Sequence, residues 1–308
     1  MKRVGIVGAS TDVHTAYLAA GISRIGAEPV VVHTDLVPRH HRLTIDDHEV
    51  RYEGVSLSEL RVLFLRRIQQ TLPIFDPDSM SLSGLPTWPE RYVAERERQS
   101  LLASAFQVLE RERLVVNSTS AINLHFLKMD QLRILAQRGV RVPRSLATSD
   151  PDEVVSFVER EGEVIYKPLA GGALVRSLRP VDLTPSKLAT LRHAPSLFQE
   201  RIPGDEHRAY VLDGEPLAAF EIPCEGVVDA REALDRARPA ELSERSWDEC
   251  VRASRALGMI FGAIDLRHSA DGAPVVLEVN PTPAISFYDD PETGAVISRL
   301  AAYLVAHA

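Results

Sequence analysis

The chain has 308 residues, of which 45% are hydrophobic and 25% are charged, the balance of an ordinary soluble protein with one large or a few smaller domains. Its formal net charge of −8 argues against general nucleic-acid binding, and no apolar run reaches the roughly 20 residues of a membrane span. Cys224 and Cys250 have no metal-binding or redox spacing, so we expect a protein of the reducing cytoplasm.

The first part of the chain alternates short apolar strands with helices. Strands are predicted at residues 3–9, 28–33, 61–68 and 114–117, and helices at residues 13–25 and 90–112. The apolar start is too short for a signal peptide, because Asp12 and His14 follow it at once. This alternation predicts a parallel sheet covered on both faces. Gly5 and Gly8 lack the G-x-G-x-x-G spacing of a dinucleotide-binding turn, so a tight strand-to-helix connection is the simpler interpretation.

The second part has a different pattern, with strands grouped around turns. Helices are predicted at residues 128–139, 150–161, 244–257 and 291–306. Strands are predicted at residues 163–169, within 196–222 around a Gly204-Asp205 turn, and as a hairpin at 260–280. A glycine-containing loop follows the first of these strands at residues 170–177.

The hairpin at residues 260–280 is the most informative segment, because Asp271-Gly272 lies between two alternating runs. If these two residues form the turn, Asp265 and Glu278 lie directly opposite each other and Asn280 shares their face. Facing carboxylates repel each other, so either one has a raised pKa or a hard cation lies between them. Two carboxylates and an amide oxygen are ligands that Mg²⁺ takes; the alternative is a hydrated polar face. The intervening residues should anchor the hairpin in a core: Ile264, Leu266, Leu277 and Val279.

Two lysines are candidates for phosphate binding. Lys167 lies inside an apolar run, where a charge is costly unless it is used or reaches solvent. The following Gly171 and Gly172 allow backbone N–H groups to approach an anion closely. Lys128, at the start of a helix, would supply a second contact. The alternatives are a lysine that reaches solvent before a surface turn and an ordinary helix lysine.

Arginines supply the remaining candidates. Arg66 and Arg67 leave a predicted strand at the edge where open α/β sheets bind ligands, and their guanidinium groups suit a substrate carboxylate. Arg176 follows the glycine loop and would close over phosphate, and Arg267 shares the face of Asp265. Each of these arginines also has the simpler interpretation of an ordinary surface residue.

The order of these elements resembles the ATP-grasp superfamily, nearest to its RimK-like ligases. The matching elements are Lys128, Lys167 with its glycine loop, a hinge at residues 198–202, the run 204–211, and Asp265 with Glu278-Val279-Asn280-Pro281. The resemblance covers about residues 115–308, and the first part of the chain matches only in its strand–helix pattern.

This resemblance implies an α/β protein with the ATP-grasp fold in three parts. They are a Rossmann-like N-terminal domain at residues 1–118, a central lid domain at 119–199, and a C-terminal α+β domain with the metal site at 200–308. It also implies ATP-binding positions, namely the phosphate contacts Lys128, Lys167, Gly171 and Gly172, the adenine hinge Gln199, Glu200, Arg201 and Ile202, and Glu206 on the ribose. Two Mg²⁺ ions, with Mn²⁺ as an alternative, would be held by Asp265, Glu278 and Asn280. Arg208 would face the phosphates or an acyl phosphate, with Arg267 and Lys167 as the other catalytic candidates.

The implied activity is an ATP-dependent carboxylate–amine ligase that works through an acyl phosphate and releases ADP and phosphate. The chain is also similar to the graspetide (microviridin-type) peptide ligases, in Leu65-Arg66-Arg67-Ile68, in a strand ending at Asn117, in the run 128–132, and in Glu292-Thr293-Gly294. It departs from them at Pro281-Thr282-Pro283-Ala284, where many of those ligases carry a Gly-Gln-Trp-like sequence.

Several alternatives therefore stay open for the partners and the function. The acceptor is an amine or hydroxyl, either on a precursor peptide or protein or on a free amino acid or dipeptide. The chain is a monomer or a homodimer, with no nucleic-acid or membrane partner. The rival functions are a non-catalytic ATP-binding regulatory module and a nicotinamide-dependent oxidoreductase.

Overall fold

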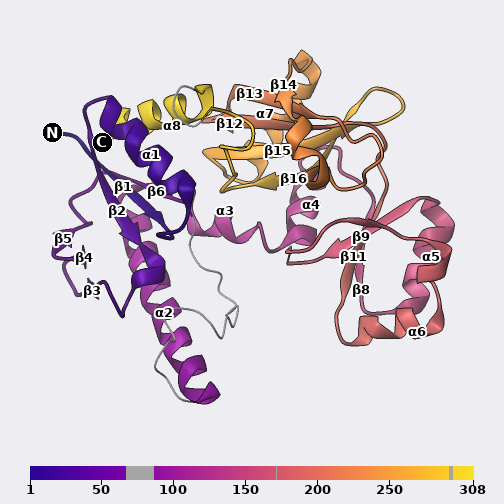
Figure 1. Cartoon of the computed structure of the whole chain (residues 1–308), viewed down its shortest axis with the longest axis horizontal. Helices are drawn as coiled ribbons and strands as arrows, with labels where there is room; N and C mark the ends of the chain where they lie inside the picture. The colour runs from indigo at the N-terminus through magenta and orange to yellow at the C-terminus, as the bar shows by residue number, and fades with distance from the viewer. Residues whose placement is uncertain (67–86, 171, 291–293) are drawn as a thin grey trace. The chain divides into compact units, whose positions relative to one another are not determined.

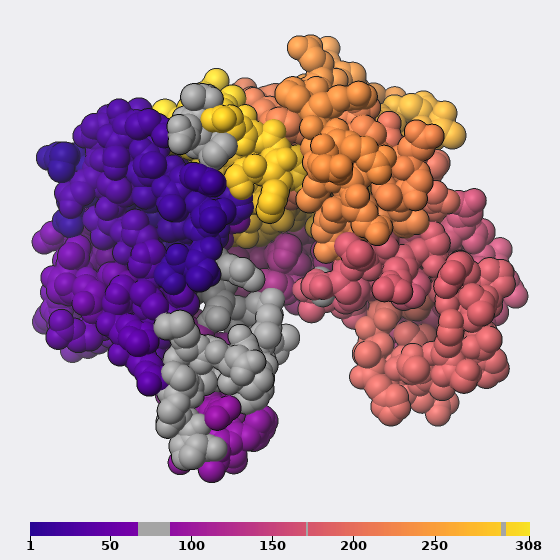
Figure 2. All heavy atoms as spheres, in the orientation of Figure 1, coloured from indigo at the N-terminus to yellow at the C-terminus, as the bar shows by residue number. Residues whose placement is uncertain are grey.

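The computed structural model describes residues 1–66, 87–170, 172–290 and 294–308 (Figure 1). It divides into two compact units, residues 1–123 with 284–308, and residues 124–283. The last segment belongs to the first unit because helix α8 (Ala295–Ala306) packs against α1 (Val13–Arg24), whereas we expected residues 200–308 to form one part. In Figure 2 the yellow C-terminal atoms accordingly border the indigo N-terminal atoms. Of the helices in the described ranges, none combines the length and apolarity needed to cross a bilayer.

The first unit is built on a four-stranded parallel sheet in the order β2-β1-β6-β7. Its strands are β1 (Arg3–Gly8), β2 (Glu28–His33), β6 (Val62–Leu65) and β7 (Leu114–Val116), close to the predicted ranges. Helix α2 (Trp88–Glu112) begins at a capping box formed by Thr87 and Glu90. The near-continuous apolar strands are buried, as in parallel sheets covered on both faces.

The polar stretch at residues 38–52 contains structure that the sequence pattern did not predict. Strands β3 (Leu43–Ile45), β4 (Val50–Tyr52) and β5 (Val55–Ser56) form a small antiparallel sheet. These strands are only two or three residues long, which is too short for alternation to be recognised.

The second unit contains two antiparallel sheets, and the first has the order β10-β9-β11-β8. Its strands are β8 (Ser145–Thr148), β9 (Val164–Pro168), β10 (Arg176–Ser177) and β11 (Ser196–Glu200). Helix α5 (Pro151–Glu161) packs against this sheet through Val154 and Phe157. The Asp150 carboxylate accepts the Asp152 N–H, so the predicted cap is confirmed.

The second sheet has the order β14-β13-β12-β15-β16 and positions the site. Its strands are β12 (Glu206–Leu212), β13 (Glu215–Ile222), β14 (Arg238–Pro239), β15 (Phe261–His268) and β16 (Pro274–Asn280). Helices α4 (Lys128–Gln137) and α7 (Glu244–Ala256) contact strand β16. Residues 196–222 thus hold three strands, with a second turn at Asp213-Gly214, where both residues have positive φ.

The predicted pairing of the hairpin is confirmed, but the predicted two-residue turn is wrong. Pairing ends at His268 and Pro274, so five residues form the loop. A β-bulge then changes the register next to Asp265, because Leu277 is an extra residue in β16. Beyond this bulge Asp265 pairs directly with Glu278. Leu277 is only half-buried, unlike the other predicted anchors.

Candidate functional site

Three charged side chains form a row across the second sheet. Arg208 on β12 pairs with Asp265 on β15, which pairs with Glu278 on β16. Directly paired residues of an antiparallel sheet project from the same face, so the sheet lines up one arginine and two carboxylates. Arg208 Nε lies 3.6 Å from Asp265 Oδ1.

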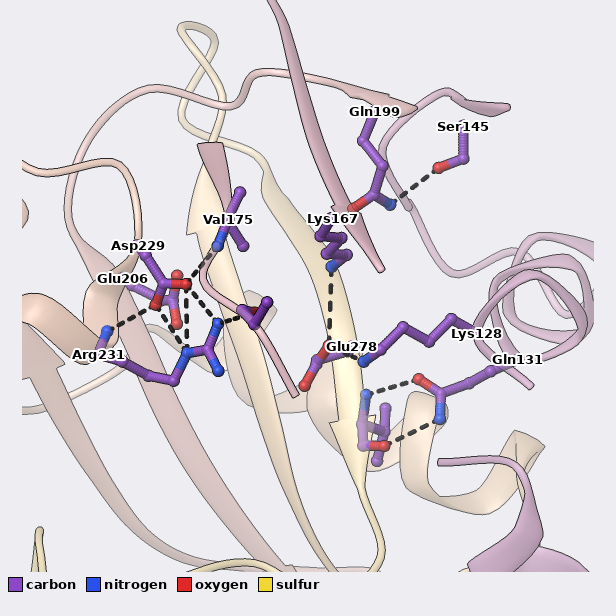
Figure 3. A network of polar contacts seen from close by, with 12 residues as sticks. Lys128, Gln131, Ser145, Lys167, Val175, Gln199, Glu206, Asp229, Arg231 and Glu278 are labelled. Atoms are coloured by element: carbon purple, nitrogen blue, oxygen red, sulfur yellow. Dashed lines mark hydrogen bonds and ion pairs between the residues drawn. The ribbon is translucent and has the colours of Figure 1, made fainter. Parts of the chain in front are cut away.

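Both predicted phosphate lysines reach the end of this row. Lys128 Nζ, at the start of α4, lies 2.5 Å from Glu278 Oε2, and Lys167 Nζ, on β9, lies 3.7 Å from the same oxygen (Figure 3). The side chains of Lys128 and Lys167 are 9% and 12% exposed and that of Glu278 is 26% exposed. Three separate elements therefore bring two ammonium groups and one carboxylate together in a largely dry position.

The pKa values of the two paired carboxyl groups, Asp265 and Glu278, are shifted in opposite directions. Burial alone would raise the pKa of Glu278, but the nearby ammonium groups of Lys128 and Lys167 bring it below the ordinary value. Burial raises the pKa of Asp265 to about 7, opposed by Arg208 and assisted by Glu206 and Glu278. Burial also lowers the pKa of Lys167.

A second ion pair lies on the same face, next to Asp265. Arg267 Nη2 donates to Glu206 Oε2 at 3.2 Å, and its guanidinium also donates to the carbonyls of Ile202 and Val228 at 3.1 Å each. Burial raises the pKa of Glu206, while Arg267 and Arg208 oppose this shift. Arg267 thus holds Glu206, the segment before β12 and the segment after β13, and its contact with an acyl phosphate stays a prediction.

The predicted adenine hinge divides into inward and outward side chains. Gln199 is buried and donates to Ser145 Oγ at 2.9 Å, and Ile202 is buried as well. Glu200 and Arg201 instead form ion pairs, at 2.6 Å with Arg144 and at 3.0 Å with Glu163. Any contact of the two outward residues with a base would therefore be made by their backbone.

The glycine loop and two arginines complete the predicted set. Gly172 has φ +91°, a conformation that favours glycine, whereas Gly171 lies outside the described residues. Arg176 is exposed on β10. In the first unit, Arg66 Nε lies 3.0 Å from Asp12 Oδ2 at the carboxyl edge of the parallel sheet, and both side chains are about nine-tenths buried. Arg67 lies outside the described residues.

Sequence reasoning missed a contact that holds the loop after Gly172. The Val175 N–H donates to Asp229 Oδ2 at 2.6 Å, and Arg231 Nη2 donates to the Ala173 carbonyl at 2.6 Å (Figure 3). Arg231 also forms an ion pair with the buried Asp229 at 2.5 Å. The only signal for this contact is an acid two residues before an arginine in a segment without periodicity.

The hairpin residues fit a magnesium–nucleotide complex better than a metal ion alone. Across the described ranges, no three His, Cys, Asp or Glu side chains are grouped as metal ligands. Asp265 and Glu278 provide two hard oxygen donors, and Asn280 Oδ1 accepts the Thr282 N–H at 3.0 Å. Mg²⁺ is usually bound by one or two carboxylates and completed by substrate phosphates, which matches this donor set beside two lysines.

Comparisons with known proteins agree with this description. No protein-family model matches the chain. The chain is 25% identical over 205 residues to the ribosomal protein bS6–L-glutamate ligase of Salmonella paratyphi B, covering 63% of this chain and 68% of that protein. The ATP-grasp ligase PsnB, solved with a minimal precursor, Mg and ADP, is 29% identical with a TM-score of 0.82, covering 99% of this chain and 97% of that chain. The macrocyclase MdnC of Microcystis aeruginosa, solved with the precursor peptide MdnA, shares the fold with a TM-score of 0.80 at 19% identity, over 99% of this chain and all of that chain (100%).

The fold is that of the ATP-grasp ligases, and the sequence is similar to ligases of that superfamily. Within that superfamily it is RimK-like and similar to the graspetide peptide ligases, as the order of its motifs predicted.

Proposed function

We propose that this protein activates a carboxylate as an acyl phosphate at the expense of ATP and joins it to an amine or hydroxyl on a peptide or protein side chain. The convergence of Lys128, Lys167 and Glu278 beside Asp265 is the observation that carries this proposal. A triphosphate needs cationic contacts and a hard-metal site together, and this cluster offers both within one unit.

The proposed reaction has two steps, activation of the carboxylate and attack by the acceptor. A substrate carboxylate oxygen attacks the γ-phosphorus, the bond to the β,γ-bridging oxygen breaks, and ADP leaves. The acceptor nitrogen or oxygen then attacks the acyl carbon, loses its proton, and displaces phosphate. Lys128 and Lys167 would bind the phosphates, and Arg208 would face the transferred group. Mg²⁺, held by Asp265, Glu278 and Asn280, would supply positive charge against the repulsion between the two anions.

The chain also has the means to exclude water from a short-lived acyl phosphate. The loop after Gly172 is held by hydrogen bonds to Asp229 and Arg231, and it would act as a lid over the phosphates. The half-buried Glu206, held by Arg267, would bind the ribose. Lid loops of this kind protect reactive intermediates from hydrolysis.

A peptide or protein substrate is supported by both kinds of relative. The Salmonella relative is named for ligation of glutamate to a ribosomal protein, and PsnB is solved with a precursor. In this chain Arg66, fixed by Asp12, is suited to a substrate carboxylate, and Arg67 and Arg176 are further candidates for contacts with substrate. The second candidate is a ligase of free amino acids or dipeptides, which the Pro281-Thr282-Pro283-Ala284 segment favours because it departs from the peptide ligases.

The test is ATP turnover with defined substrates. Purified protein is mixed with ATP, Mg²⁺ and either short acidic peptides encoded next to its gene or mixtures of free amino acids. ADP release that depends on a peptide, with loss of one water from the peptide mass per bond formed, is the expected result. Dipeptide products would select the second candidate. Nucleotide binding with no ADP release under any condition would contradict a ligase and select a regulatory module.

A further inference from the structure

A buried glutamine on α4 forms two hydrogen bonds with the backbone of strand β16. Gln131 is 2% exposed. Its Oε1 accepts the Val279 N–H at 2.8 Å, and its Nε2 donates to the Val279 carbonyl at 2.9 Å (Figure 3). A single side-chain amide thus satisfies both backbone groups of one residue.

This contact replaces a missing neighbour strand. Among the residues that the structure describes, β16 is the last strand of its sheet, so its outward N–H and C=O groups have no strand partner there. The amide of Gln131 presents one donor and one acceptor, the same pair that a neighbouring strand would offer to Val279. The segment held in this way follows directly after the bulge at Leu277, where regular pairing is interrupted.

Val279, the residue that Gln131 binds, lies between two proposed metal ligands. Val279 has Glu278 on one side and Asn280 on the other, so the position of its backbone determines where the Cα atoms of both neighbours lie. Gln131 is three residues after Lys128 on the same helix, and residues at this spacing share a helix face. Helix α4 therefore contacts two consecutive residues of β16, through the Lys128–Glu278 ion pair and the Gln131–Val279 hydrogen bonds.

We propose that Gln131 is a positioning residue, which fixes Glu278 and Asn280 for the metal and couples them to the phosphate lysine Lys128. This inference rests on the proposed function, because it assigns the metal-binding geometry of that same site to a residue that touches neither metal nor nucleotide. Residues that orient metal ligands from behind typically change metal affinity by about 10- to 100-fold when they are replaced.

The probe is Mn²⁺ in the presence of ADP, with bound ion measured by the loss of the free Mn²⁺ signal in electron paramagnetic resonance. Gln131→Met keeps the length of the side chain and removes both hydrogen bonds. We expect its Mn²⁺ affinity to fall about 10- to 100-fold. Gln137→Met, an exposed position on the same helix, is the matched control and should bind like wild type. Gln131→Asn keeps the amide but shortens its reach, so it should lie in between.

Amide hydrogen exchange provides a second readout, since the Val279 N–H should exchange faster in Gln131→Met than in the control. Equal Mn²⁺ affinity of wild type and Gln131→Met would overturn the inference alone, even if the melting temperature fell. If Gln131→Met does not fold, equal affinity of Gln131→Asn and wild type would overturn it in the same way. A wild-type chain that binds no Mn²⁺ with ADP would overturn the proposed function and this inference together.

Discussion

The carboxylate of Glu278 contacts two ammonium groups, and Glu278→Gln removes its charge while keeping its shape. Lys128 and Lys167 would then be left close together, each about nine-tenths buried, without the anion between them. Removing one partner of a buried ion pair costs about 3–5 kcal/mol. Because Glu278 is 26% exposed and the amide oxygen still accepts a hydrogen bond, we expect a loss of about 2–3 kcal/mol in the free energy of unfolding.

The size of this effect depends on pH in a defined way. The pKa of Glu278 is lowered in the fold, so its contribution is complete above the ordinary pKa of glutamate and is lost as the pH falls through the folded-state value. At pH 7 the nucleotide-free variant should therefore melt about 4–10 °C below wild type. Glu163→Gln is the control, because it removes only a surface ion pair with Arg201 and should change the melting temperature little.

Nucleotide binding separates this explanation from a general loss of stability. In the variant both lysines are released from the carboxylate, so ADP in the presence of EDTA should bind at least as well as to wild type. Adding Mg²⁺ should then strengthen ADP binding to wild type but not to the variant, because one of the proposed ligands is gone. Thermal shift with ADP, with and without Mg²⁺, measures both effects. A variant that keeps the wild-type Mg²⁺ dependence would refute the reasoning, and so would a nucleotide-free melting temperature equal to that of wild type.

Three further variants test neighbouring parts of the site. Lys167→Ala should weaken ADP binding in calorimetry by at least about tenfold, because a charge-assisted contact is worth about 1.5–3 kcal/mol, whereas the surface control Lys187→Ala should not; equal affinities would count against a phosphate role. Asp265→Asn should stabilise the nucleotide-free protein at pH 8 by on the order of 2–4 kcal/mol, and less at pH 5, because a folded-state pKa of about 7 means that wild type loses stability as the pH rises from the ordinary aspartate value to 7. Urea unfolding at both pH values checks this, and a loss of stability at pH 8 would contradict it. Asp229→Asn should speed proteolysis near Val175, since it weakens the contact that holds this loop; unchanged cleavage would show that the contact is dispensable.

The strands could be predicted because their signals are local. The assumed two-residue turn at residues 271–272 placed Asp265 opposite Glu278, and this pair is observed because the extra residue Leu277 compensates for the longer loop. The same Asp-Gly signal gives a two-residue turn at 213–214 but lies within a five-residue loop at 269–273. In the longer loop, the Ser269 hydroxyl donates to Asp271 and to the Ala273 carbonyl. Such side-chain hydrogen bonds compete with the tight turn and are not visible in an apolar–polar pattern.

The residues that sequence reasoning missed act across long separations. Gln131 meets Val279 148 residues further along the chain, and Val175 meets Asp229 54 residues further along. In each contact one polar side chain, Gln131 or Asp229, binds the backbone of a distant residue, and the apolar–polar periodicity of its own segment does not identify that partner. The resemblance to a family assigned Lys128 and Glu278 to the same nucleotide site, but the direct contact between them, at a separation of 150 residues, was not predicted.

The extra residue Leu277 influences how the carboxylates of the site are oriented, although it is not itself a proposed ligand. Asp265 pairs with Glu278 on one side of the bulge and Leu266 pairs with Val276 on the other, so deleting residue 277 would leave both pairings available to a regular ladder. Bulges bend a strand and increase its local twist, so that deletion would straighten β16 while keeping every proposed ligand. This single-residue deletion would thus rotate the carboxylate oxygens of β16 relative to the two lysines without removing any proposed ligand.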